Sequence, residues 1–197
     1  MSIDNPVVND YVIEIPELIS HLPTADEVKA ISSAKVGSVT PEFTSAWDGQ
    51  TWYLITGNTK CESVISKFNS SHLVAYPEVW LCEKVADKWI RPHIDTERLS
   101  VLIYPIEPTS YDIKFVDKWE DDLALFTRDY ENTVPYSYNT VHTHTYTCPT
   151  LINAKTPHCL PSTAAKTTLQ ISMYFGNSAS DWANIKSLYQ AGNLITI

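Results

Sequence analysis

Residues 91–106 read RPHIDTERLSVLIYPI, in which a short polar segment runs directly into an apolar stretch. His93 and Asp95 are two positions apart in the polar segment, and on an extended chain residues i and i+2 project to the same side. The apolar stretch, 99–106, predicts a buried strand. The sequence therefore places an imidazole and a carboxylate side by side at the edge of a β core, and such a pair can supply two ligands of a metal site.

The third ligand has to come from a distant segment. His158 is the best candidate, because it follows Pro157 where a short apolar run, 151–154, ends in a turn. Two histidines and one carboxylate on one face of a metal, with the other positions open, form the geometry of non-haem Fe(II) oxygenases. Alternatively, none of these residues binds a metal. His93 and Asp95 would then be a hydrogen-bonded pair at a strand end, and His158 would be an isolated histidine in a turn.

The composition is that of an ordinary globular protein. The 197 residues are 44% apolar and 19% charged, which predicts a single domain over residues 1–197 with a substantial core. The net charge is −9, from 14 basic and 23 acidic residues. The sequence has no cluster of basic residues, which argues against binding to nucleic acid. Binding to an anionic membrane surface is disfavoured for the same reason.

Location is predicted from the ends and the cysteines. Residues 1–20 contain acidic but no basic residues, so they do not read as a secretory signal, and no apolar run approaches transmembrane length. The four cysteines show no C-x-x-C spacing, which argues against structural zinc and a disulfide framework. We expect a cytoplasmic, reduced protein.

The order of predicted elements indicates a mainly β fold. An N-terminal strand is expected within 7–18, a helix beginning at Thr24 and ending by Gly37, a strand at 52–55 and a short helix at 62–68. Strand-like runs separated by turns then follow, at 74–77, 79–85, 99–106, 111–116, 122–126, 141–147 and 167–175. A capped helix at 180–186 closes the chain. This pattern predicts a sandwich or barrel with flanking N-terminal and C-terminal helices.

The last strong strand has two different faces. Read with a period of two, one face carries Lys166 and Thr168, followed by Gln170 and Ser172, while the residues between them are mainly apolar. In a closed β core the polar face would line a cavity. A cationic head beside a hydroxyl is a suitable clamp for the carboxylate of an anionic ligand.

With these segments in place, the sequence resembles the Fe(II)- and 2-oxoglutarate-dependent oxygenases, particularly compact prolyl-hydroxylase-like and phage-encoded members. The resemblance covers roughly residues 74–176. It rests on His93-Ile94-Asp95 with the strand 98–104, on 149–153 running into His158, and on Lys166 at the head of 169–173. It implies a double-stranded β-helix, or jelly-roll, core of about this length.

The resemblance also implies a cofactor set and roles for particular residues. His93, Asp95 and His158 would hold Fe(II), Lys166 with Thr168 would bind the distal carboxylate of 2-oxoglutarate, and dioxygen would take the last open position. Tyr104 would be a second contact to 2-oxoglutarate. The sequence departs from the family in having lysine at 166, where arginine is commoner, and in a short spacing between His158 and Lys166.

A competing metal motif is His142-Thr143-His144, which also puts two imidazoles on one strand face. A cupin site would continue with a glutamate, and none follows in 145–148. We therefore interpret this segment as a polar edge strand or as a lining of the cavity mouth that contacts substrate.

The predicted function is hydroxylation of a C–H bond in an amino-acid residue or a small molecule by a dioxygenase. The alternative is a β-sandwich binding or structural module, a catalytically degenerate relative of the same fold. A nucleic-acid demethylase is disfavoured by the charge and by Lys166-Thr167-Thr168-Leu169, which stands where those enzymes carry an arginine-rich signature. Specificity loops are expected within 40–60 and 127–147, but their sequence does not identify the substrate.

Overall fold

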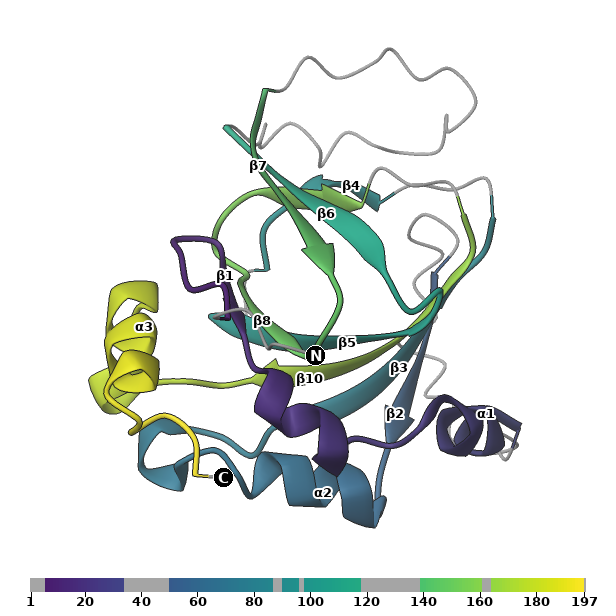
Figure 1. Cartoon of the computed structure of the whole chain (residues 1–197), viewed down its shortest axis with the longest axis horizontal. Helices are drawn as coiled ribbons and strands as arrows, with labels where there is room; N and C mark the ends of the chain where they lie inside the picture. The colour runs from purple at the N-terminus through teal and green to yellow at the C-terminus, as the bar shows by residue number, and fades with distance from the viewer. Residues whose placement is uncertain are drawn as a thin grey trace.

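The computed structural model describes residues 6–33, 50–86, 90–95, 98–117, 139–160 and 164–196. Two antiparallel sheets face each other across an apolar interior, and helices cover the outer face of the larger sheet (Figure 1). This arrangement confirms the predicted mainly β, jelly-roll core with flanking helices.

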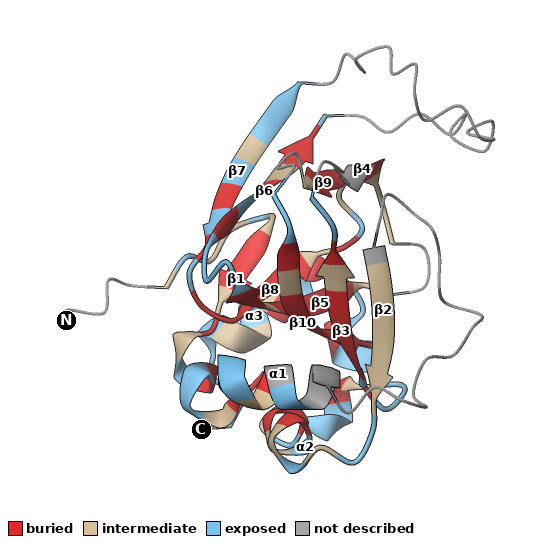
Figure 2. Ribbon diagram, turned by 90° about the vertical axis from the view of Figure 1, so that its right-hand side faces the viewer, coloured by how far each residue is buried: buried red, intermediate tan, exposed pale blue. Residues whose placement is uncertain are grey.

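The larger sheet has six strands, and its strand order brings segments from the whole chain together. In spatial order they are β1 (Val12–Glu14), β8 (Thr150–Asn153), β5 (Ser100–Glu107), β10 (Lys166–Met173), β3 (Glu78–Lys84) and β2 (Gln50–Ile55). Every pairing is antiparallel. The buried residues of this sheet concentrate on its central strands (Figure 2).

The smaller sheet carries the polar segment that follows β4. Its strands, in spatial order, are β4 (Ile90–His93), β9 (His158–Leu160), β6 (Tyr111–Val116) and β7 (Thr140–Tyr146). Both β4 and β6 pair with β9. The strand β9 therefore brings the segment around residue 158 against the segment around residue 93.

The alternation along β10 determines what faces the interior. Leu169, Ile171 and Met173 belong to the core between the larger sheet and its helices. Thr168 and Ser172 point to the other side, where they contact Tyr111 and Arg98. The predicted polar face of this strand is thus confirmed, and it looks toward the smaller sheet.

The helices begin where their sequences provide caps. Thr24 and Glu27 form a reciprocal capping box before α1 (Ala25–Ser33). The Asn58 side chain accepts from two backbone amides of α2 (Thr59–Ile65), and Asp181 caps α3 (Trp182–Gln190). Short 3-10 helices complete the set: η1 (Pro16–His21), η4 (Ser70–His72) and η6 (Asn177–Ala179). None of the helices in the described part of the chain is long and apolar enough to cross a membrane.

Several predicted boundaries were wrong. Residues 74–77 do not form a strand, and the predicted N-terminal strand is limited to β1 because Pro16 starts η1. The short helix begins at 59 instead of 62, since Asn58 is the cap. The predicted strand at 122–126 lies outside the described residues, as do residues 40–49 and 127–138 of the two predicted specificity loops.

The hydroxyl of Tyr146 gives a prediction about stability. This side chain is fully buried between the sheets, and its oxygen has no hydrogen-bond partner among the described residues. An unsatisfied buried hydroxyl is unfavourable, so Tyr146→Phe should raise the free energy of unfolding by about 1 kcal/mol, measured by urea denaturation. Tyr111→Phe is the matched control, because the Tyr111 hydroxyl is 3.0 Å from Thr168 Oγ1. It should instead lower that free energy, and equal effects of the two changes would contradict the prediction.

Candidate metal centre

The structure brings His93, Asp95 and His158 together, although His158 lies 63 positions after Asp95 in the sequence. One potential ligand atom from each lies within 4.8 Å of the others. His93 ends β4, His158 begins β9, and the two are direct cross-strand partners with ring centroids 4.4 Å apart. The backbone amide of Asp95 donates to the carbonyl of Ala154 at 2.8 Å, which holds the segment after β4 beside the two histidines.

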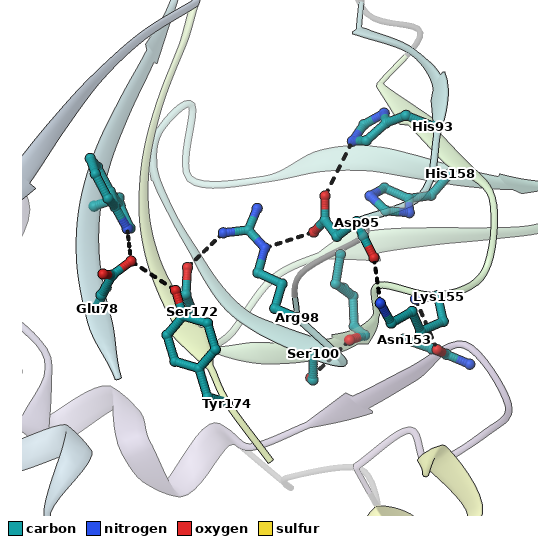
Figure 3. Close-up of polar contacts among 12 residues, drawn as sticks. Glu78, His93, Asp95, Arg98, Ser100, Asn153, Lys155, His158, Ser172 and Tyr174 are labelled. Carbon is teal, nitrogen blue, oxygen red and sulfur yellow. Dashed lines mark hydrogen bonds and ion pairs between the residues drawn. The ribbon is translucent and has the colours of Figure 1, made fainter. Parts of the chain in front are cut away.

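The two carboxylate oxygens of Asp95 have different surroundings (Figure 3). Oδ2 accepts a hydrogen bond from Arg98 Nε at 2.8 Å, whereas Oδ1 lies 4.0 Å from His93 Nε2. Burial is the largest influence and opposes ionisation, but the charges of Arg98, His158 and His93, with the hydrogen bond from Arg98, together outweigh it, so the pKa of Asp95 is below its usual value. Asp95 is therefore an anionic carboxylate with one oxygen directed to the histidines, where it could serve as a metal ligand.

We call His93, Asp95 and His158 the triad. Two cationic side chains that are not part of the triad hold the segment around Asp95 in place. Arg98 bridges Asp95 and the larger sheet, because its Nη1 donates to Ser172 Oγ at 2.6 Å. Lys155 Nζ donates to the backbone carbonyl of Asp95 at 2.8 Å. Such outer contacts orient metal ligands and tune their basicity. Thr96, the other neighbour of Asp95 that could contribute, lies outside the described residues.

His158 is held as a neutral imidazole. Its side chain is buried, and Nδ1 lies 2.8 Å from the carbonyl oxygen of Thr156. Because a carbonyl only accepts, Nδ1 carries the proton and Nε2 presents its lone pair. Burial, with the nearby His93, lowers the pKa of His158 to about 4. The two imidazoles and the carboxylate form a donor set that suits Fe(II).

The lowered pKa of His158 predicts acid sensitivity of the metal-free protein. Between pH 6.5 and about 4 the unfolded chain binds a proton at this histidine and the folded chain does not. Folding stability therefore falls as the pH falls through this window, by about 3 kcal/mol in total. Urea denaturation of the wild type and His158→Gln from pH 7 to 4 should show a shallower loss in the variant, and parallel curves would contradict this assignment.

The residues predicted to anchor a carboxylate lie on β10, facing the interior. Lys166 is buried, and its ammonium lies 3.9 Å from the centroid of the Tyr111 ring. Burial, followed by the charge of Lys84, lowers the pKa of Lys166 to about 8. No carboxylate among the described residues forms an ion pair with this ammonium. Thr168 lies beside it, hydrogen-bonded to Tyr111.

The prediction for Tyr104 does not fit the structure. Tyr104 pairs with Leu169 and packs against the core on the helix side of the larger sheet, on the opposite face from Lys166. Tyr111, which sequence reasoning missed, occupies the interior position beside Lys166 and Thr168. The signal that could have found it is its place at the head of a strand-like run that alternates, with Asp112 and Lys114 on its outer face.

His142 and His144 face the interior but belong to a different region. His142 stacks on Tyr11 with ring centroids 4.7 Å apart, and His144 Nε2 lies 3.8 Å from a carboxylate oxygen of Glu14. Among the described residues they form no group of three metal-ligating side chains. They connect β7 to the N-terminal segment instead of extending the metal centre.

Comparisons with known proteins show which solved structures have a similar fold. No protein-family model matches the chain, and no curated protein matches it in sequence. A prolyl-4-hydroxylase from Pseudomonas putida is similar in structure with a TM-score of 0.44 and 12% identity, over 80% of this chain and 90% of that one. A prolyl hydroxylase from Trichoplax adhaerens, solved with a hypoxia inducible factor peptide, has a TM-score of 0.50 and 12% identity, over 83% of both chains. The likeness to the second structure shows that this chain shares the jelly-roll fold of a prolyl hydroxylase.

Proposed function

We propose that residues 1–197 form a single non-haem Fe(II)- and 2-oxoglutarate-dependent dioxygenase domain that hydroxylates a C–H bond of an amino-acid residue or a small molecule. The observation that carries this proposal is the convergence of His93, Asp95 and His158 within 4.8 Å on a jelly-roll core. With Fe(II), 2-oxoglutarate and dioxygen bound, a centre of this kind couples oxidative decarboxylation of 2-oxoglutarate to substrate hydroxylation.

The protein's own contribution is to hold neutral and anionic ligands in fixed positions. The hydrogen bond from Nδ1 to the Thr156 carbonyl keeps His158 in one tautomer. Arg98 occupies one oxygen of Asp95, which leaves the other for a metal. The tilted rings of His93 and His158 lie beside each other across the β4 and β9 pairing. His93, Asp95 and His158 would hold Fe(II), and a metal held by only three protein ligands would have positions available for cosubstrate and dioxygen.

Lys166 supports the cosubstrate assignment. A buried ammonium without a carboxylate partner is unfavourable unless a ligand supplies the counter-charge. The distal carboxylate of 2-oxoglutarate would supply it, with Thr168 and Tyr111 as neighbouring hydrogen-bonding groups. Because the Lys166 ammonium is a point charge, we expect it to contact one oxygen of the distal carboxylate of 2-oxoglutarate, whereas an arginine could contact both oxygens.

The test is ligand-dependent thermal stability, with Mn(II) in place of Fe(II) under air. A ligand that binds only the folded protein adds about 2.7 kcal/mol at a hundredfold excess over its Kd, which should raise the Tm by about 5–10 °C. We expect metal and 2-oxoglutarate each to raise the Tm, and His93→Ala to remove the effect of the metal. If the protein were instead a degenerate binding module, neither addition would stabilise it, and His93→Ala would alter neither ligand binding nor stability.

A further inference from the structure

A second polar group lies at the rim of the larger sheet, and we call Glu78, Trp80 and Tyr174 the rim cluster. Glu78 is the exposed first residue of β3. Its Oε2 accepts from Tyr174 Oη at 2.8 Å and from Trp80 Nε1 at 3.3 Å. Two neutral donors on one oxygen orient the carboxylate, and neither of these hydrogen bonds uses Oε1.

The rim cluster lies on the same face of the sheet as the polar contacts of the metal centre. Glu78 is the direct cross-strand partner of Ser172, so the two side chains project to the same side. Ser172 in turn accepts from Arg98, which binds Asp95. Figure 3 shows Glu78, Ser172, Arg98 and Asp95 in succession across the space between the sheet and the two histidines.

Glu78 has an unmatched charge. In the part of the chain that the structure describes, no ammonium or guanidinium pairs with it. Arg98 approaches this region, but its Nε and Nη1 are engaged by Asp95 and Ser172. A fixed carboxylate beside two aromatic side chains is suited to an organic cation, and the net charge of −9 attracts cations to the protein as a whole.

We propose that the rim cluster binds a cationic group of the substrate, so that the substrate class is a lysine-like or arginine-like molecule or residue. This proposal rests on the proposed function, because it takes the triad as the place of chemistry. Glu78 is then a specificity-determining residue: it receives the ammonium or guanidinium, while the rest of the substrate extends over Arg98 toward the triad.

The experiment is a titration of the metal-free protein, followed by NMR, with Nα-acetyl-lysine amide and its neutral isostere Nα-acetyl-norleucine amide. The wild type should bind the lysine probe about tenfold more tightly, and added salt should weaken this preference. Glu78→Gln keeps the size and an acceptor oxygen but removes the charge, and should reduce the preference to less than about twofold. Glu62→Gln, an exposed residue of α2, makes the same change in net charge and should leave the preference intact.

Equal binding of the two probes by the wild type, or binding of neither, would overturn the proposal, even if Glu78→Gln failed to fold. A preference that survives in Glu78→Gln would overturn it as well. Because the titration uses neither metal nor 2-oxoglutarate, its failure is separable from failure of the proposed function, which the thermal stability measurement tests.

Discussion

Replacing Asp95 with alanine is expected to abolish metal binding at the triad and, with it, turnover. Asp95 is the anionic member of the group, and its Oδ1 lies toward His93. Changes in residues that merely orient metal ligands cost about 10–100-fold in affinity, so loss of a charged ligand should exceed about 100-fold. Anaerobic titration with Fe(II), followed by calorimetry, measures the effect.

The same substitution should also destabilise the metal-free protein. Arg98 would lose its partner at 2.8 Å, although its side chain is only 21% exposed. Loss of a hydrogen bond to a charged group costs about 2 kcal/mol. Asp95→Asn is the matched control, since it keeps the shape and one acceptor oxygen but not the charge. Wild-type affinity for Fe(II) in either variant would contradict the assignment of Asp95 as a ligand.

Replacing Lys166 with methionine is expected to weaken the binding of 2-oxoglutarate and, at the same time, to stabilise the metal-free protein. Without the ammonium, affinity for 2-oxoglutarate should fall by about 100-fold, since a charge-assisted contact in a buried site is lost, while Fe(II) affinity should not change. The metal-free protein should become more stable, because a buried cation without a carboxylate partner is replaced by an apolar side chain of similar length.

Stability measured against pH gives a second test of the same residue. With a pKa of about 8 in the folded protein and 10.5 in the unfolded chain, Lys166 loses its proton earlier when folded. The wild type should therefore gain stability between these pH values, and Lys166→Met should lack this gain. Lys60→Met, at an exposed ion pair with Glu27, is the control and should change stability by less than about 1 kcal/mol. Unchanged 2-oxoglutarate affinity in Lys166→Met would contradict the proposal that Lys166 binds the distal carboxylate of 2-oxoglutarate.

The sequence predicted the parts of the site that follow from strand periodicity. His93 and Asp95 were recognised from their spacing at the edge of an apolar run, and Lys166 and Thr168 from the alternation of the last strand. In the structure all four face the interior, close to His158 or Tyr111. Their side-chain directions could be predicted because side-chain direction along an extended segment is a local property of the backbone.

The sequence could not decide which face of a uniformly apolar strand looks inward. Residues 99–106 are apolar on both faces, so nothing in the run distinguished Tyr104 from its neighbours. The register with β10 makes Tyr104 a partner of Leu169 on the helix side. The strands β4 and β9, with four and three residues, were too short to show a period at all, and the contact of Arg98 with Ser172 spans 74 positions.

The most direct test of the central claim is anaerobic titration of the protein with Fe(II) and 2-oxoglutarate, followed by visible absorption. Chelation of Fe(II) by 2-oxoglutarate gives a weak charge-transfer band. We expect a band in the wild type that needs both additions and disappears in His158→Ala, which would place metal and cosubstrate at the triad. Absence of the band in the wild type, or its persistence in His158→Ala, would contradict the assignment of His93, Asp95 and His158 as an Fe(II) centre.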